Sequence, residues 1–243
     1  MFANSIGKRS LSKAHKQLAP NLYAVPPDLV PLKPGQEAYG TTLLEQSVPR
    51  GPEGSPLLFV VPHGGVRGGD QVTEDDVARL TAANSAAVHE ALRALRVSEV
   101  LAVDCGGDVL TGGLDFATHV ELGRDRQVLR ALQTSGVPFT TLVLGPGCDA
   151  ESSVAVMTEA VRGLADKDEL LGVMPLDEVA TVAASFCTTL SDSRTPNLIH
   201  AAVVRQRDAP GEGGLCAITR HGNTQRIPWS WLRLGVAFRG GVK

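Results

Sequence analysis

Carboxylates and glycines gather in three short stretches of this 243-residue chain, and each stretch follows a run of apolar residues. Asp104 and Asp108 flank the pair Gly106 and Gly107 after the apolar run 100–103. A carboxylate at the end of a buried strand can bind Mg²⁺, accept a hydrogen bond from a sugar hydroxyl or act as a general base. Alternatively, it caps backbone N–H groups in a tight turn. We take the two aspartates as candidates for catalysis and metal binding, and the two glycines as candidates for ligand binding.

The second stretch follows the apolar run 141–144 and contains Gly145, Gly147, Asp149 and Ser152. Glycine allows the backbone to approach a ligand, and the N-terminus of a following helix attracts an anion. Gly145, Gly147 and Ser152 are therefore candidate ligand-binding residues. Asp149 either satisfies the helix dipole itself or recruits a divalent cation, which makes it a third candidate metal ligand.

The third stretch, His63-Gly64-Gly65, follows the apolar run 57–61. Histidine titrates near neutral pH, so His63 is a candidate general acid or base, and the alternative is a histidine hydrogen-bonded within its own turn. Gly64 and Gly65 are candidate ligand-binding residues for the same reason as the other glycines. Arg124 could bind a phosphate bidentately, or it could be a solvated helix start or part of an internal ion pair.

Several well-known classes of site are not supported by the sequence. The chain has no G-x-G-x-x-G, Gly-Lys-Ser/Thr or Gly-x-Ser-x-Gly motif, and none of its four cysteines has C-x-x-C spacing. The net charge of −3 does not favour binding to nucleic acid. No apolar run approaches the roughly 20 residues of a membrane span. We therefore expect a cytoplasmic protein with reduced thiols and a small anionic ligand, without nucleic-acid or membrane partners.

The apolar runs that precede the three stretches are predicted strands over 57–61, 100–103 and 139–144. Thr73 begins a predicted helix that extends to about Arg96, with an acidic first turn after the capping residue. This order predicts a β-α-β unit over 57–104. Because the carboxyl ends of parallel strands meet at one edge of a sheet, the three stretches are expected to form one site.

The remaining elements suggest a single α/β domain over residues 57–243. Its predicted fold is three-layer and Rossmann-like, with a mostly parallel sheet and helices on both faces. Residues 21–56 carry seven of the 15 prolines, so residues 1–56 are expected to form a Pro-rich, largely irregular segment. The further predicted elements are a helix from Arg124, a helix capped by Asp149 or Ser152, a helix of about 176–190, a helix from Thr195, and strands over 215–219 and 233–238 that pair antiparallel at one edge.

Residues 103–110, 121–125 and 145–152 together resemble the DUF1152 family, a poorly characterised family with a Rossmann-like fold. The resemblance implies no settled reaction. Family members tend to open with a strand and a glycine-rich turn, whereas this chain opens with Phe2-Ala3-Asn4-Ser5, which resembles a point after that first unit. A missing unit would leave a sheet edge or helix face bare and favour a homo-oligomer. Otherwise, the basic residues of 1–20 could form a targeting segment.

We carry two hypotheses for the function. The first is a metal-assisted enzyme or former enzyme that binds a small phosphorylated or nucleotide-like ligand at the strand C-terminal ends; the sequence does not identify its cofactor, for which Mg²⁺ is a candidate. The alternative is a non-catalytic, degenerate protein of the same fold that binds a metabolite or a partner. In either case Asp108 is expected to lie in a loop with its side chain directed to solvent or ligand.

Overall fold

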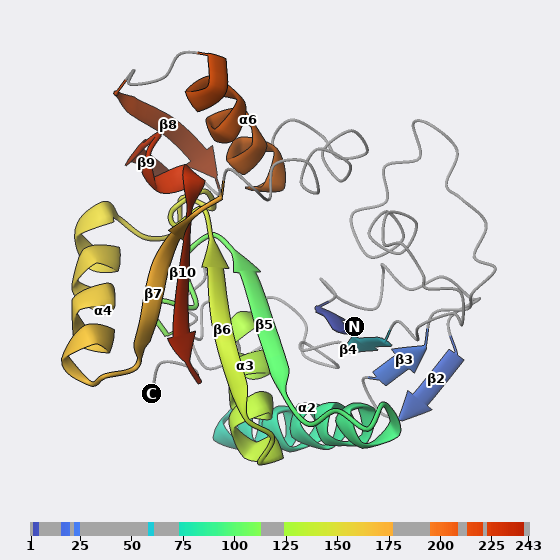
Figure 1. The fold of residues 1–243 in the computed structure, drawn as a ribbon. Helices are drawn as coiled ribbons and strands as arrows, with labels where there is room; N and C mark the ends of the chain where they lie inside the picture. The colour runs from blue at the N-terminus through green and yellow to red at the C-terminus, as the bar shows by residue number, and fades with distance from the viewer. Residues whose placement is uncertain are drawn as a thin grey trace, which may run out of the picture. The chain divides into compact units, whose positions relative to one another are not determined.

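The computed structural model describes residues 2–4, 16–19, 22–24, 58–60, 73–112, 124–176, 195–208, 213–220 and 223–240. The chain divides into two compact units. The first unit contains residues 1–98 and 117–137, and the second contains residues 99–116 and 138–243. Figure 1 shows the elements of both units.

The first unit contains a sheet of short strands in the order β1-β4-β3-β2. These strands are β1 (Phe2–Asn4), β4 (Leu58–Val60), β3 (Leu22–Ala24) and β2 (Lys16–Ala19). β4 pairs parallel with β1 on one edge and antiparallel with β3 on the other, so neither edge is open to a further strand. The predicted β-α-β unit over 57–104 is therefore wrong, because the strand that begins at residue 100 belongs to a different sheet.

The helices of the first unit are α2 (Glu74–Ala94) and α3 (Arg124–Ser135). The predicted start of α2 is confirmed. Thr73 Oγ1 accepts a hydrogen bond from the Asp76 N–H, and Asp76 Oδ2 accepts one from the Thr73 N–H, each at 3.2 Å. This reciprocal capping satisfies two N–H groups that a helix start otherwise leaves without partners.

A buried polar pair lies between α2 and α3. Asn84 and Gln127 are 1% and 0% exposed, and the Asn84 Nδ2 donates to the Gln127 Oε1 at 3.1 Å. The Gln127 Nε2 in turn donates to the Thr81 Oγ1 at 3.2 Å. Buried amides are stable only when they are hydrogen-bonded, so this pair favours one alignment of the two helices.

Replacing Asn84 with leucine is expected to destabilise the protein by about 1–3 kcal/mol, because the Gln127 carbonyl loses a buried hydrogen bond. Urea denaturation measures the difference. Replacing both partners, as in Asn84→Leu/Gln127→Leu, is expected to recover much of this loss, since no buried amide then remains in the pair. The single variant Gln127→Leu is measured as well. If the double variant loses at least as much free energy of unfolding as the two single variants lose together, the pairing is contradicted.

The second unit contains a mixed four-stranded sheet in the order β5-β6-β10-β7. β5 (Val100–Cys105) pairs parallel with β6 (Phe139–Leu144), and β10 (Leu234–Arg239) pairs antiparallel with both β6 and β7 (Leu170–Pro175). The α/β class is confirmed, but the mostly parallel sheet is wrong. The reason is that the C-terminal strand β10, whose residues 235–238 are buried, inserts between two strands that run in the opposite direction to it.

Two sequence predictions in the second unit missed a strand. Residues 170–175, to which the sequence analysis assigned no element, form β7, and residues 177–190 of the next predicted helix lie outside the part of the chain that is described. β8 (Leu215–Arg220) pairs antiparallel with β9 (Asn223–Pro228), which the sequence did not predict. The expected pairing of 215–219 with 233–238 is therefore wrong, since the latter residues lie in β10 of the four-stranded sheet apart from residue 233, which ends the preceding 3-10 turn.

The helices of the second unit are α4 (Val154–Asp166) and α6 (Thr195–Asp208), and the 3-10 turn η4 (Trp231–Arg233) leads into β10. α4 is capped by Ser153, whose Oγ accepts from the Val156 N–H, so the predicted caps Asp149 and Ser152 are wrong. In Figure 1, α6 and the β8–β9 hairpin lie beyond the ends of β5 and β6. No helix among the described residues is both long enough and apolar enough to cross a membrane.

Candidate functional site

The loops that follow β5 and β6 lie side by side, and we call residues 106–112 and 145–153 the strand-end loops. The Gly106 N–H donates to the Leu144 carbonyl at 3.1 Å, and the Gly147 N–H donates to the Gly106 carbonyl at 2.6 Å. Two of the three predicted stretches therefore meet. The expectation that all three share one sheet edge is wrong, because β4 belongs to the sheet of the first unit. His63, Gly64 and Gly65 lie outside the described residues.

Asp104 and Asp108 form a carboxylate pair at the end of β5. One carboxylate oxygen of each lies within 4.8 Å of the other. Asp104 is half-buried and Asp108 is only 3% exposed, which excludes solvent as the direction of the Asp108 side chain and leaves the alternative that it faces a ligand. The loop folds back on itself, and the Asp108 Oδ1 accepts from the Val109 N–H at 3.0 Å while the Asp108 carbonyl accepts from the Thr111 N–H at 3.1 Å. Two close carboxylates with restricted access to water are a suitable donor set for a hard divalent cation.

Asp149 connects the two strand-end loops through its carboxylate. A Cβ atom at Gly106 would overlap this carboxylate. Burial raises the pKa of Asp149 above its ordinary value, and hydrogen bonds from the backbone N–H groups of Glu151, Asp149 itself, Asp108 and Gly107 oppose that rise. The Glu151 N–H lies 3.1 Å from the Asp149 Oδ1. The N–H groups that could have held a ligand anion are thus engaged by a side chain of the protein.

Gly145 and Gly147 are required by internal packing. Both have positive φ, +58° and +89°, where residues with a side chain are strained. A Cβ at Gly145 would lie 2.5 Å from the Ile199 Cγ1, and one at Gly147 would lie 2.7 Å from the Ile227 Cδ1. Ile199 and Ile227 belong to the buried core cluster of the second unit. These glycines therefore allow α6 and the β8–β9 hairpin to pack closely on the loop after β6.

Ser152, in the loop after β6, makes a second contact between the two strand-end loops. It is buried, and its Oγ lies 3.3 Å from the Thr111 Oγ1, which also donates to the Asp108 carbonyl at 2.9 Å. Sequence reasoning missed Thr111, since a single threonine within a long loop gives no signal of its own. Arg124 begins α3 in the first unit, and its side chain lies outside the described part of the chain.

Cys148 is unsuited to act as a nucleophile in this site. Burial raises the pKa of the Cys148 thiol well above its ordinary value, and the neighbouring Cys105, Asp149 and Asp104 add to the rise, although Arg220 partly opposes it. Only a thiolate is an effective nucleophile. Cys148 is therefore a buried thiol, and the carboxylates remain the candidate reactive groups of the site.

The family resemblance is confirmed by comparison with family models. The model described as protein of unknown function (DUF1152) matches residues 61–214, which is more than half of the chain. The chain belongs to the DUF1152 family. The match contains both strand-end loops and ends before β8, so the β8–β9 hairpin and β10 lie beyond the matched segment. No curated protein and no solved structure matches the chain.

Gly147→Ala is expected to destabilise the protein by about 1–3 kcal/mol, because alanine is strained at this φ and its methyl group collides with Ile227. Gly163→Ala is the matched control. Gly163 lies within α4 and nothing would lie within 4 Å of an added Cβ, so alanine there is expected to stabilise by about 0.5–1 kcal/mol. Urea denaturation compares the two variants, and equal stabilities would contradict the packing described for Gly147.

The raised pKa of Asp149 predicts how pH affects stability. Between its ordinary value of 3.8 and the higher value in the folded state, the folded protein binds more protons than the unfolded chain. The contribution of Asp149 to the free energy of unfolding therefore falls as pH rises through this interval. Asp149→Asn does not titrate, so its stability relative to wild type is expected to improve between pH 4 and pH 7 in urea denaturation. The opposite trend would mean that hydrogen bonds from the N–H groups lower the pKa of Asp149 by more than burial raises it.

Proposed function

We propose that the chain binds a small phosphorylated or nucleotide-like molecule at the ends of β5 and β6, through Mg²⁺ held by Asp104 and Asp108. The observation that carries this proposal is the separation of less than 4.8 Å between oxygens of the two carboxylates, at the end of a strand in an α/β sheet. Ligands of α/β proteins bind at the carboxyl ends of parallel strands. Mg²⁺ in proteins is held by one or two carboxylates and completes its shell with water and ligand phosphates.

The electrostatics of the strand-end loops support a cation between protein and ligand. Asp104, Asp108 and Asp149 are carboxylates close to this edge, and like charges in a partly buried place disfavour ionisation of one another. Asp149 already accepts a hydrogen bond from the Glu151 N–H, and the nearby N–H groups of Gly107 and Asp108 also favour its charged form. An anionic ligand at this edge therefore needs positive charge that the loops do not supply, and a divalent cation on Asp104 and Asp108 supplies it. Mg²⁺ bound there would neutralise charge on the phosphate oxygens of the ligand.

The positions of Asp104 and Asp108 are determined by different parts of the fold. Asp104 is a strand residue in register with Val143 of β6. Asp108 is held by the Val109 N–H and by the turn that its carbonyl makes with Thr111. Because strand pairing holds the backbone of Asp104 and the turn at Val109 and Thr111 holds Asp108, the pair is preorganised for a cation.

The alternative function is the non-catalytic binding of a metabolite or partner. The observation in its favour is that Asp149, Ile199 and Ile227 fill the places where a ligand would meet the backbone of the glycine-rich loops. A thermal-shift screen, described below, serves to identify a phosphorylated ligand. Release of phosphate from that ligand in the presence of Mg²⁺ would support an enzyme. Binding without turnover would favour the alternative.

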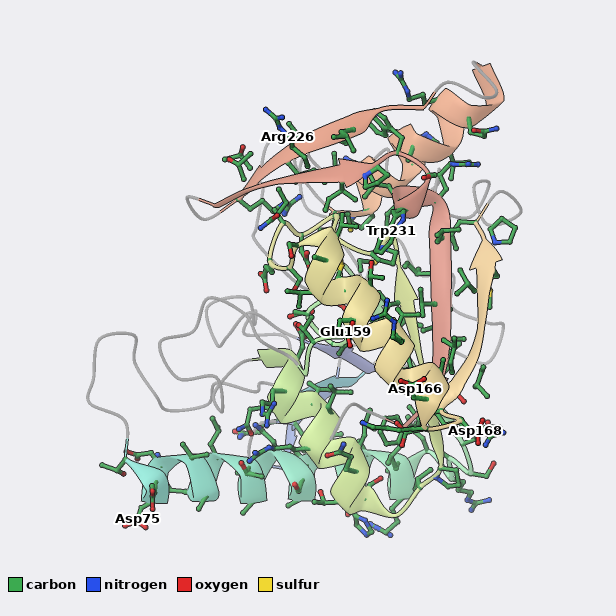
Figure 2. All side chains as sticks on the ribbon, turned by 90° about the vertical axis from the view of Figure 1, so that its left-hand side faces the viewer. Asp75, Glu159, Asp166, Asp168, Arg226 and Trp231 are labelled. Carbon is green, nitrogen blue, oxygen red and sulfur yellow. The ribbon has the colours of Figure 1, made fainter. Side chains whose placement is uncertain are left out.

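Asp104→Asn and Asp108→Asn are each expected to weaken Mg²⁺ and Mn²⁺ binding about tenfold or more, measured by titration calorimetry. A charge-assisted contact contributes about 1.5–3 kcal/mol, and about 1.4 kcal/mol corresponds to a factor of ten. Asp166→Asn is the matched control, since Asp166 is an exposed aspartate at the end of α4 in the same unit (Figure 2). If Asp166→Asn weakens binding as much as the other two substitutions, the ion is bound unspecifically and the proposal fails.

The ligand class is tested by a thermal-shift screen of nucleotides and sugar phosphates, with Mg²⁺ and with a chelator. The proposal expects a rise in Tm that requires Mg²⁺ and that disappears in Asp108→Asn. Circular dichroism of each variant without ligand shows whether it is folded. A rise in Tm that persists in the chelator and in Asp108→Asn would overturn the role of the carboxylate pair.

A further inference from the structure

The second unit contains a pocket of about 400 Å³ that is separate from the carboxylate pair. Its walls come from α6, from the start of β8 and from the segment between the end of β9 and η4. The lining residues that matter here are Arg205, Gly214, Leu215, Pro228, Trp229 and Arg233. Ligand pockets have volumes of about 300–1,000 Å³, so the space suits a small organic molecule.

Arg205 and Trp229 form one wall of the pocket. The Arg205 guanidinium carbon lies 5.3 Å from the centroid of the Trp229 ring, which is the distance of a cation–π contact. Trp229 packs against the buried core cluster, and its backbone N–H donates to the Gly214 carbonyl at 3.2 Å. A guanidinium that is positioned over a fixed ring keeps its N–H edge in a defined plane, which prepares it for a planar or tetrahedral oxyanion.

Arg233 brings a second guanidinium from a different element. Its carbonyl accepts from the Leu176 N–H at 2.8 Å, and the carbonyl of the next residue, Leu234, accepts from the Gly145 N–H at 2.8 Å. Gly145 and Leu176 directly follow β6 and β7. The backbone of Arg233 is therefore held at the sheet edge where β6 and β7 end, which is the edge used for ligand binding in α/β proteins.

The chemistry of the pocket wall is that of an oxyanion site with an apolar side. The described lining residues include the two arginines Arg205 and Arg233, while Leu215, Pro228 and Trp229 provide apolar surface. Guanidinium groups bind phosphates and carboxylates bidentately. We propose that this pocket binds a small organic oxyanion, a phosphate or a carboxylate, between Arg205 and Arg233, with the apolar or planar part of the molecule against Trp229. None of these residues takes part in the proposed Mg²⁺ site.

Titration calorimetry in a chelating buffer tests the proposal with phenyl phosphate, benzoate and inorganic phosphate. At least one of the two aromatic anions is expected to bind, and inorganic phosphate is expected to bind more weakly because it lacks the apolar part. Stronger binding of phenyl phosphate or of benzoate identifies the ligand as a phosphate or a carboxylate. Absence of binding of both aromatic anions at millimolar concentration would overturn the proposal.

Arg205→Gln and Arg233→Gln are each expected to weaken the binding of the better probe at least tenfold. Arg226→Gln is the matched control, because Arg226 is exposed on β9 of the same hairpin and does not line the pocket (Figure 2). Binding that is unchanged in Arg205→Gln and Arg233→Gln, or weakened equally in Arg226→Gln, would show that the arginines do not form a site.

Two further variants keep the test decisive. Arg205→Lys preserves the positive charge and removes the paired N–H donors of the guanidinium. It is therefore expected to bind the better probe more weakly than wild type and more tightly than Arg205→Gln. This comparison holds even where Arg205→Gln fails to fold, since Arg205→Lys with wild-type affinity would contradict bidentate binding. Asp108→Asn is expected to leave probe binding unchanged, which separates this pocket from the proposed Mg²⁺ site.

Discussion

The buried carboxylate of Asp149 determines how the loops after β5 and β6 meet. Its desolvation is unfavourable, and the N–H groups of Gly107, Asp108 and Glu151 offset part of that cost. Gly106 has to be glycine because the carboxylate occupies the place of its Cβ. The contact therefore joins two loops that lie about 40 residues apart in the sequence and gives them one relative position.

This use of the backbone N–H groups changes what the sheet edge can bind. Glycine-rich loops after parallel strands commonly present such groups to a phosphate. In this member of the DUF1152 family a protein carboxylate receives them, and the nearby Asp104 and Asp108 add further negative charge. This arrangement supports the proposed cation site, and the buried Cys148 thiol, whose pKa is raised, adds no nucleophile to it.

The layer formed by α6 and the β8–β9 hairpin depends on the same loops. Ile199 and Ile227 pack where Gly145 and Gly147 lack a side chain, so the hairpin and the helix are held close to the end of β6. Two residues of the pocket wall come from here, since Arg205 lies on α6 and Trp229 directly follows β9. The packing of Ile199 and Ile227 on the two glycines therefore also positions the helix and hairpin that border the arginine-lined pocket.

The sequence by itself determined several local elements and the family. Thr73 and Asp76 specify the start of α2, and the apolar runs of β5 and β6 are visible because a buried strand needs continuous apolar residues. The tertiary structure alone decided which strands pair. β4 joins the N-terminal strands, and β10 inserts beside β6. A strand pairs where its backbone groups find hydrogen-bond partners and its apolar side chains are buried. Both conditions depend on distant parts of the chain, so no local pattern encodes the choice. It also decided the role of Asp149, because the N–H donors that bind its carboxylate include those of Gly107 and Asp108, which come close only after β5 and β6 have paired.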